Sequence, residues 1–232
     1  VPVAALGIPG VTDPALEAVA GGLTWFKLGQ LDAPIQALKK AGVRKVVMAG
    51  KVQHVSLFGG VRPDWRAAKL LLSLKDKRTD TILRAVAAEF AKDGLELISS
   101  AAYLEHLLAP TGPMTRRSFT KEQISDAALG WKAAKAVAGF DIGQTVIVQD
   151  GTVVAVEGME GTDACVRRAC ELAGSQGRDP SLVVVKVAKP RQDFRFDLPV
   201  VGLDTLGTFR DAGVKALALE AGSTLIFDRE RF

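Results

Sequence analysis

The sequence predicts an α/β protein of two domains, and three observations support this fold class. Short β-branched runs alternate with amphipathic helical segments through the first half of the chain. The composition combines 48% hydrophobic residues with only 6% aromatic ones, a mixture typical of Val- and Leu-rich strands covered by Ala- and Leu-rich helices. An Asp-Gly pair between two β-branched runs predicts a hairpin in the second half. The two halves are therefore expected to differ in topology.

The first half is expected to form a Rossmann-like domain of parallel strands. Strands are predicted at residues 3–6, 23–27, 45–49 and 95–98, and helices at 13–20, 31–41, 64–74 and 79–93. This order implies right-handed crossovers and a ligand crevice at the carboxyl ends of the strands. Gly50 follows the third strand, so we expect the loop formed by Gly50, Lys51 and Val52 to bind substrate.

The second half is expected to be a mixed α/β domain. A loop rich in Pro and Gly at 109–113 is the predicted linker, and we place the boundary after Gly112, which gives domains at 1–112 and 113–232. Asp150 and Gly151 suit the positive φ angles of a type I′ turn between strands at 145–149 and 152–157. Further strands are predicted at 182–187, 193–197, 216–219 and 223–227, with helices at 121–138 and 204–212.

Composition limits the expected cellular compartment and the classes of ligand. The formal net charge is +4, and scattered basic residues suit a polyanionic small molecule or an anionic membrane surface. They form no stripe interleaved with aromatic residues, so nucleic-acid binding is not expected. Cys165 and Cys170 fall in one predicted helix and form no disulfide framework. With no run of about 20 apolar residues, we expect a cytoplasmic protein, and peripheral contact with a membrane is left open.

One candidate anion site follows the second strand of the hairpin. The segment from Glu157 to Cys165 leaves that strand and enters a helix, with Thr162 or Asp163 as the predicted N-cap. Backbone N–H groups at such a helix start, together with the helix dipole, bind phosphate groups. The alternative is that Thr162 only caps its helix.

A second candidate site lies in the segment VVVKVAKPRQDFRFD. Lys186, Lys189 and Arg195 are cations that can neutralise the charge that develops on phosphate oxygens, and Asp197 supplies a carboxylate for Mg²⁺ or for the attacking water. Alternation along the predicted strand 193–197 would place Asp197 on the same face as Arg195. The alternative is a solvated edge strand, in which the charges only prevent pairing. Neither zinc-ligand spacing nor a nucleotide-binding glycine fingerprint occurs.

Taken together, these segments resemble the LpxI family of UDP-2,3-diacylglucosamine pyrophosphatases, which act in lipid A biosynthesis. The resemblance extends through nearly the whole chain, in stretches such as FKLGQLDAPIQALKKAGVRKVVMAGKV and DIGQTVIVQDGTVVAVEGMEGTDA. Its most specific motifs are EGTDA, KVAKPRQD and DLPVVG. The family begins with a strand and a Gly-rich loop ahead of the region that matches 3–6, and the sequence contains neither. That loop is expected to approach the nucleotide closely.

The resemblance implies a function, a cofactor and a set of site residues. It implies Mg²⁺-dependent hydrolysis of UDP-2,3-diacylglucosamine to UMP and 2,3-diacylglucosamine 1-phosphate (lipid X), with the substrate between two domains. The essential aspartate of the family falls on Asp197, although Phe196 replaces the usual valine. Gly161, Thr162 and Asp163 fall on its Glu-Gly-Thr-Asp element, and Gln144 on its Gly-Gln pair. Asp163 is a second expected metal ligand.

Two questions stay open at this point. A non-catalytic protein that binds a nucleotide-sugar or an acylated sugar phosphate would use the same anion sites, although a carboxylate beside a diphosphate favours an enzyme. The sequence also does not fix the oligomeric state, so a homodimer is left open. If the lipid substrate is correct, the membrane contacted would be the inner membrane.

Overall fold

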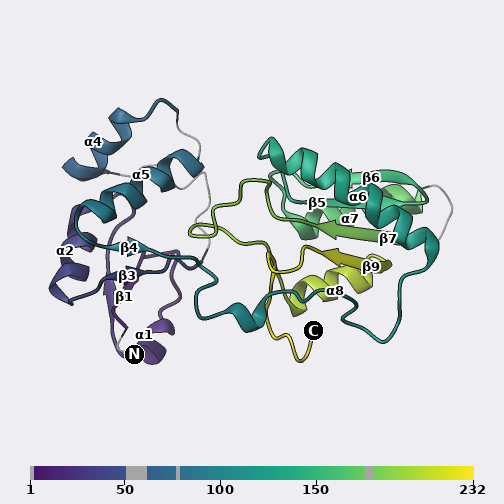
Figure 1. Cartoon of the computed structure of the whole chain (residues 1–232), viewed down its shortest axis with the longest axis horizontal. Helices are drawn as coiled ribbons and strands as arrows, with labels where there is room; N and C mark the ends of the chain where they lie inside the picture. The colour runs from purple at the N-terminus through teal and green to yellow at the C-terminus, as the bar shows by residue number, and fades with distance from the viewer. Residues whose placement is uncertain (1–2, 51–61, 77–78, 176–179) are drawn as a thin grey trace. The chain divides into compact units, whose positions relative to one another are not determined.

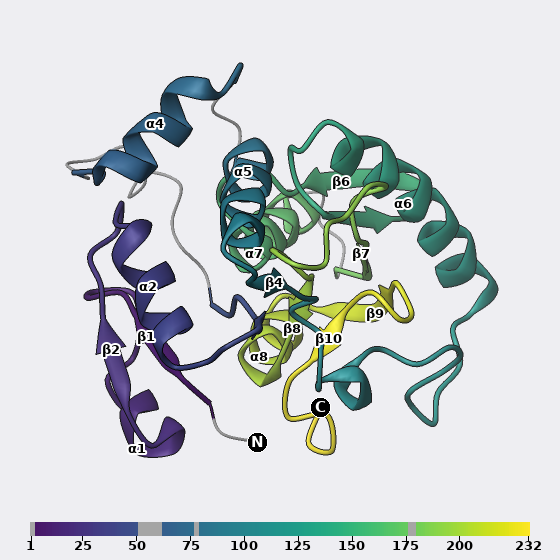
Figure 2. The same cartoon turned by 60° about the vertical axis from the view of Figure 1, so that its left-hand side comes forward.

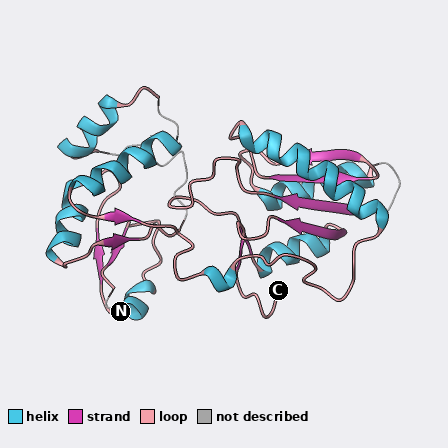
Figure 3. Ribbon diagram, viewed as in Figure 1, coloured by secondary structure: helices cyan, strands magenta, loops and turns pink. Residues whose placement is uncertain are grey.

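The computed structural model describes residues 3–50, 62–76, 79–175 and 180–232 of the chain. It divides into two compact units, Val1–Ser100 and Ala101–Phe232. The predicted boundary after Gly112 lies further along the chain, and the extent of the two folding domains stays a prediction. Figure 1 shows the order of the elements along the chain, and Figure 3 separates helices and strands from loops.

The first unit is a set of parallel strand pairs and helices. Strand β1 (Ala5–Gly7) pairs in parallel with β2 (Leu23–Trp25), and β3 (Lys45–Val46) pairs in parallel with β4 (Glu96–Leu97). The helices described in this unit are α1 (Leu16–Ala20), α2 (Asp32–Lys40), α4 (Trp65–Ser73) and α5 (Thr79–Lys92). The predicted order of strands and helices is confirmed, with strands shorter than expected.

The helices of the first unit meet through an apolar core and a charged contact. Ile35 and Leu38 of α2, Leu70 of α4 and Leu95 before β4 are buried in one cluster. Asp64 caps α4 by accepting a hydrogen bond from the Ala67 N–H, and its second oxygen accepts from the backbone at the start of α2. Asp64 and this apolar cluster therefore join α2 to α4.

The second unit is built on a four-stranded mixed sheet in the order β6-β5-β7-β9. The strands are β5 (Thr145–Gln149), β6 (Thr152–Val156), β7 (Leu182–Lys186) and β9 (Val214–Leu219). Strand β5 is antiparallel to β6 and β7, whereas β7 and β9 are parallel. At the β5–β6 turn, Asp150 and Gly151 have φ angles of 51° and 73°, as a type I′ turn requires. The predicted hairpin and mixed topology are confirmed.

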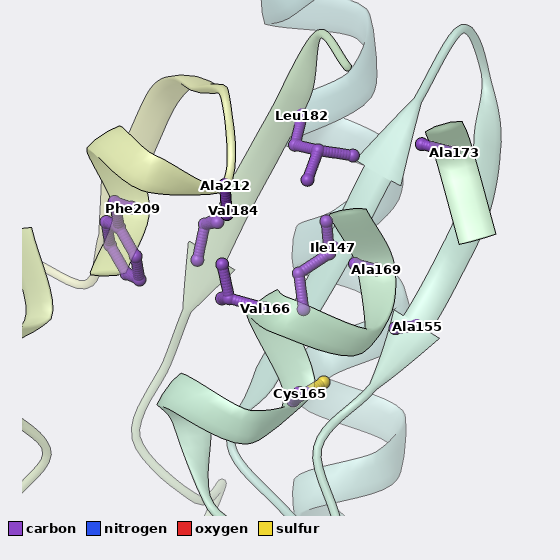
Figure 4. Packing of buried hydrophobic residues seen from close by; sticks show 10 residues of the cluster. All are labelled: Ile147, Ala155, Cys165, Val166, Ala169, Ala173, Leu182, Val184, Phe209 and Ala212. Carbon is purple, nitrogen blue, oxygen red and sulfur yellow. The ribbon is translucent and has the colours of Figure 1, made fainter. Parts of the chain in front are cut away.

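Helices cover both faces of this sheet. Helix α6 (Lys121–Gly139), which begins with a capping box of Thr120 and Gln123, packs small residues on Val146, Val183 and Val185. A Cβ atom at Gly130 of α6 would lie 2.6 Å from a Val185 methyl, so this helix is very close to the sheet. Helices α7 (Thr162–Gly174) and α8 (Leu203–Asp211) contact the opposite row of strand residues, as Figure 4 shows.

The remaining elements surround this core. A short 3₁₀ helix, η1 (Glu105–Leu107), precedes α6, and β8 (Val200–Val201) pairs in parallel with β10 (Leu225–Ile226). Figure 2 labels β8 and β10 beside each other. The segment before α6 belongs to this unit, since the Ala109 N–H donates to the Thr224 carbonyl and Ala109 is buried with β8 and β10.

Two local predictions are wrong. Residues 193–197 form a turn instead of a strand, because Asp193 accepts hydrogen bonds from the Arg195 backbone and guanidinium, and its carbonyl accepts from the Phe196 N–H. The N-cap of α7 is Gly161, with φ 82° and no side-chain cap. Thr162 and Asp163 are instead the first residues of the helix.

Candidate functional site

Polar residues gather at one end of the four-stranded sheet in the second unit. At this end, Glu157 follows β6, Lys186 ends β7 and Glu220 follows β9, while Gln144 directly precedes β5. Strand pairing brings Thr145 opposite Lys186, and Lys186 opposite Leu219. Three strands thus contribute their carboxyl ends to one place, where α/β folds commonly bind ligands. We refer to it as the site end of the sheet.

A buried lysine and a buried glutamate are joined there by a threonine hydroxyl. The Lys186 ammonium donates to Thr162 Oγ1 at 2.7 Å, and Thr162 Oγ1 donates to Glu157 Oε1 at 2.8 Å. Lys186 is 7% exposed and Glu157 9%, so each charge lies mostly away from water. Lys186 also donates to Thr145 Oγ1 at 3.3 Å. Because buried charges are costly unless compensated, these hydrogen bonds hold the cation in a defined position.

The other carboxylate oxygen of Glu157 is connected to Asp197 through Gln144. Glu157 Oε2 accepts from the Gln144 N–H at 3.1 Å, and the Gln144 side-chain amide donates to Asp197 Oδ2 at 3.4 Å. The Gln144 amide oxygen is buried with no hydrogen-bond partner among the described residues. Asp197 itself is exposed. The site therefore presents a carboxylate to solvent from a buried polar support.

Gln192 orders the loop between β7 and β8. Its amide nitrogen donates to the Asp197 carbonyl at 3.0 Å and lies 3.5 Å from Asp197 Oδ2, while its oxygen accepts from the Lys189 N–H. The Lys189 ammonium pairs with Asp141 at 2.5 Å, and Asp141 has a φ of 61°. Two amide side chains, from Gln144 and Gln192, therefore converge on Asp197.

The start of this loop is fixed by an ion pair. Glu220 Oε2 accepts from the Ala188 N–H at 2.7 Å, and the Lys135 ammonium of α6 donates to the Ala188 carbonyl at 2.9 Å. Lys135 and Glu220 also bind each other at 2.6 Å. Both backbone groups of Ala188 are therefore held, directly after the strand that ends in Lys186.

Arg195, Asp163 and Gly161 take different positions from those expected. Arg195 forms a two-pronged pair with Asp193 at 2.9 and 2.7 Å, and this hydrogen bonding raises the pKa of its guanidinium. Asp163 lies in the first turn of α7. Nearby, a hydrogen bond from Arg168 lowers the pKa of the Glu160 carboxyl.

Gly50 belongs to the first unit, after β3, with a φ of 99°. Lys51 and Val52, which were expected to continue its loop, lie outside the described residues. An open cavity of about 560 Å³ in the same unit is lined by residues 9–14 and Trp25, at the carboxyl ends of β1 and β2. This cavity lies beside the β1–β2 pair, whereas Gly50 follows β3 of the other pair, and substrate binding at Gly50 stays a prediction.

Hydrogen bonds through Glu157 and Gln192 join five of the predicted residues, namely Gln144, Thr162, Lys186, Asp197 and, by its backbone N–H, Lys189. Sequence reasoning missed Glu157 and Gln192. Both residues lie in the two candidate segments, because Glu157 begins the segment from Glu157 to Cys165, and Gln192 lies between Lys189 and Asp197. What was missing was the pairing of β5 with both β6 and β7, which brings Gln144 between them.

Comparison with known proteins now identifies the family. The model of the LpxI N-terminal domain matches residues 1–107, and that of the LpxI C-terminal domain matches residues 110–232.

The chain belongs to the LpxI family.

A curated relative supports the assignment. The chain is 34% identical over 224 residues to the UDP-2,3-diacylglucosamine pyrophosphatase LpxI of Caulobacter vibrioides, an alignment that covers 94% of this chain and 79% of that protein. The resemblance inferred from the motifs is confirmed. Within the LpxI family model, the site end of the sheet falls entirely in the C-terminal domain. Among the described residues, no helix is both long and apolar enough to cross a membrane.

Proposed function

We propose that this LpxI family member hydrolyses the diphosphate of UDP-2,3-diacylglucosamine, releasing UMP and 2,3-diacylglucosamine 1-phosphate (lipid X) in lipid A biosynthesis. The name of the Caulobacter relative supports the substrate. The observation that carries the proposal is an exposed carboxylate, Asp197, held by Gln144 beside the buried Lys186 cation system. A protein that only bound a diphosphate would gain little from that carboxylate.

In this proposal some side chains stabilise negative charge and others orient the attacking water. The Lys186 ammonium and the N–H groups that open α7 favour negative charge on the diphosphate oxygens as the bond to the UMP leaving group breaks. Asp197 orients the attacking water and accepts its proton. Gln144 and Gln192 keep the carboxylate aimed while it does so.

The residues fit a requirement for Mg²⁺. The Asp197 carboxylate and the Gln144 amide oxygen are the oxygen donors that this ion prefers, and Asp163 is a further candidate ligand. Among the described residues, no three His, Cys, Asp or Glu side chains group as metal ligands. Bound there with the substrate, Mg²⁺ would neutralise charge on the diphosphate, and the phosphate oxygens would complete its coordination.

One further expectation accompanies this proposal, namely that the acyl chains lie between the two domains in an apolar channel. It follows from the resemblance and from the size of the acyl chains, which need an apolar cover larger than a soluble surface usually exposes. Peripheral contact with the inner membrane and a homodimer stay open.

The test is UMP release from UDP-2,3-diacylglucosamine with Mg²⁺ and with EDTA. Asp197→Asn is expected to leave the melting temperature and substrate binding nearly unchanged but to lower kcat by a factor of about 10² or more, because the lost interaction belongs to the transition state. Asp163→Asn is the comparison for the second proposed ligand. Wild-type turnover by the Asp197→Asn variant would remove Asp197 from the mechanism, and substrate binding without any UMP release by the wild-type protein would favour the binding-protein alternative.

A further inference from the structure

Glu157 is a buried carboxylate whose two oxygens serve two different parts of the site. Oε1 accepts from the Thr162 hydroxyl at 2.8 Å, and Oε2 accepts from the Gln144 N–H at 3.1 Å. Thr162 also accepts a hydrogen bond from Lys186, and the Gln144 side-chain amide donates to Asp197. These two chains of hydrogen bonds are the Lys186 branch and the Asp197 branch. Glu157 therefore hydrogen-bonds to both branches.

Hydrogen-bond chemistry fixes the direction of both contacts. An ammonium group can only donate, so the Thr162 oxygen accepts from Lys186, and its own proton goes to Glu157 at 2.8 Å, a much nearer acceptor than Thr145 Oγ1 at 3.4 Å. The backbone N–H of Gln144 is also a donor. Position 157 thus faces two donors, and a carboxylate, which only accepts, satisfies both.

The backbone at this position is equally constrained. The Glu157 N–H donates to the Thr145 carbonyl at 2.9 Å. A Cβ atom at residue 143 would lie 2.0 Å from the Glu157 carbonyl oxygen. Only a glycine at Gly143 lets the two segments approach so closely, and this approach brings the Gln144 N–H within reach of the Glu157 side chain.

From this geometry we propose that Glu157 is a positioning residue, which sets the place of Asp197 through Gln144 and the place of Lys186 through Thr162. The inference rests on the proposed hydrolysis, because it assigns a role within that site. Glu157 acts through these neighbours, since both of its carboxylate oxygens already accept hydrogen bonds inside the protein.

The same unit contains a matched control. Asp126 of α6 is 6% exposed, and its two oxygens accept from the Asp150 and Gly151 N–H groups at 3.0 and 2.7 Å. It too is a buried carboxylate that faces two donors. It lies at the β5–β6 turn, the opposite end of these strands from Glu157.

The experiment compares Glu157→Gln with Asp126→Asn. Each substitution turns an acceptor oxygen into an NH₂ group that opposes a donor, so both are expected to lower the melting temperature to a similar extent. Glu157→Gln is expected to lower kcat at least about 10-fold with KM nearly unchanged, because displacement of catalytic groups by about 1 Å costs up to about 10² in rate. Asp126→Asn should retain kcat within about twofold, as expected for a carboxylate outside the site. Equal loss of turnover in the two variants, or wild-type kcat in Glu157→Gln, would overturn the proposal.

A second pair of variants applies if Glu157→Gln does not fold. Thr162→Val breaks only the branch to Lys186, and Thr162→Ser retains the hydroxyl. We expect kcat to fall in the Val variant and to recover most of its value in the Ser variant. Wild-type turnover in Thr162→Val would remove the link from Glu157 to Lys186.

A readout without turnover separates this proposal from the proposed function. The ¹⁵N–¹H signals of the Gln144 side-chain amide, assigned by their loss in Gln144→Ala, should shift in Glu157→Gln and stay in place in Asp126→Asn. That result in a protein that releases no UMP would reject the hydrolytic function but retain the positioning contact. Unchanged Gln144 signals in a folded Glu157→Gln variant would reject the positioning role, whatever the activity.

Discussion

Replacing Gly143 by alanine should damage the fold and the site together. The added methyl would lie 2.0 Å from the Glu157 carbonyl oxygen and 2.7 Å from its carbonyl carbon. Carbon–oxygen contacts between backbone segments are normally about 3.3 Å or longer, so the two segments must separate by about 1.3 Å. Both atoms belong to the backbone of Glu157, directly after β6, and backbone cannot rotate away as a flexible side chain would.

The destabilisation caused by Gly143→Ala should be near the upper end of the range found for overpacked sites. Overpacking of a well-packed site costs about 1–3 kcal/mol, and about 3 kcal/mol corresponds to a melting temperature lower by about 6–12 °C in a protein of this size. Separation of the two segments also lengthens the hydrogen bond from the Gln144 N–H to Glu157, so kcat for UMP release should fall as well. Thermal unfolding followed by circular dichroism and the UMP assay measure the two effects.

Gly207→Ala is the control for this prediction. Gly207 lies within α8, and a Cβ atom there would meet nothing within 4 Å. Alanine is the better helix former, so this variant should be more stable by about 0.5–1 kcal/mol and fully active. If Gly143→Ala melted and turned over like the wild-type protein, the close approach of residues 143 and 157 would be refuted.

Four further outcomes are expected. Burial raises the pKa of the Cys165 thiol to about 11, so at pH 8 iodoacetamide should modify Cys170 and spare Cys165, as mass spectrometry of the peptides would show; equal labelling would contradict this. The folded state holds the Cys165 proton more tightly than the unfolded state, so the free energy of unfolding should fall as pH rises from 9 toward 11 and should not depend on this group below pH 9. In urea unfolding, the Cys165→Ala variant should therefore lose less stability over this pH range than the wild-type protein. Glu220→Gln should lower stability by about 1–3 kcal/mol and reduce kcat, because an NH₂ group would face the Lys135 ammonium or the Ala188 N–H. An unchanged kcat would show that the Glu220 contact does not support the site. Thr120→Ala should cost about 1 kcal/mol through the lost cap of α6 with full turnover, and a loss of activity there would count against a purely structural cap.

Much of the fold followed from local patterns. The Asp150-Gly151 pair predicted both positive φ angles, and the β-branched run at 182–187 predicted the strand β7, which is buried along its whole length. The prediction for 193–197 was wrong because alternating Asp, Phe and Arg residues have the period of a strand, while the Asp193 side chain bonds locally to Arg195 and closes a turn. Periodicity does not register such side-chain competition.

The candidate site could be predicted only in part, for a different reason. Asp197 and Lys186 were identified from charge and motif, but their support depends on strand partners that are distant in sequence. Glu157 reaches Gln144 because β6 pairs with β5, and Lys186 reaches Thr162 because α7 packs beside β7. Pattern reasoning finds residues that carry chemistry more readily than residues that hold them.

The alternation along β7 has a consequence for folding fidelity. Leu182, Val184 and Lys186 face the side of α7 and α8, whereas Val183 and Val185 face α6. A slip of β7 by one residue would exchange the two rows, which would bury the ammonium of Lys186 against α6 and put a valine beside Thr162. Such a chain would lose its core packing as well as its cation, so mispaired molecules are expected to be unstable and open to proteolysis instead of accumulating as a folded but inactive population.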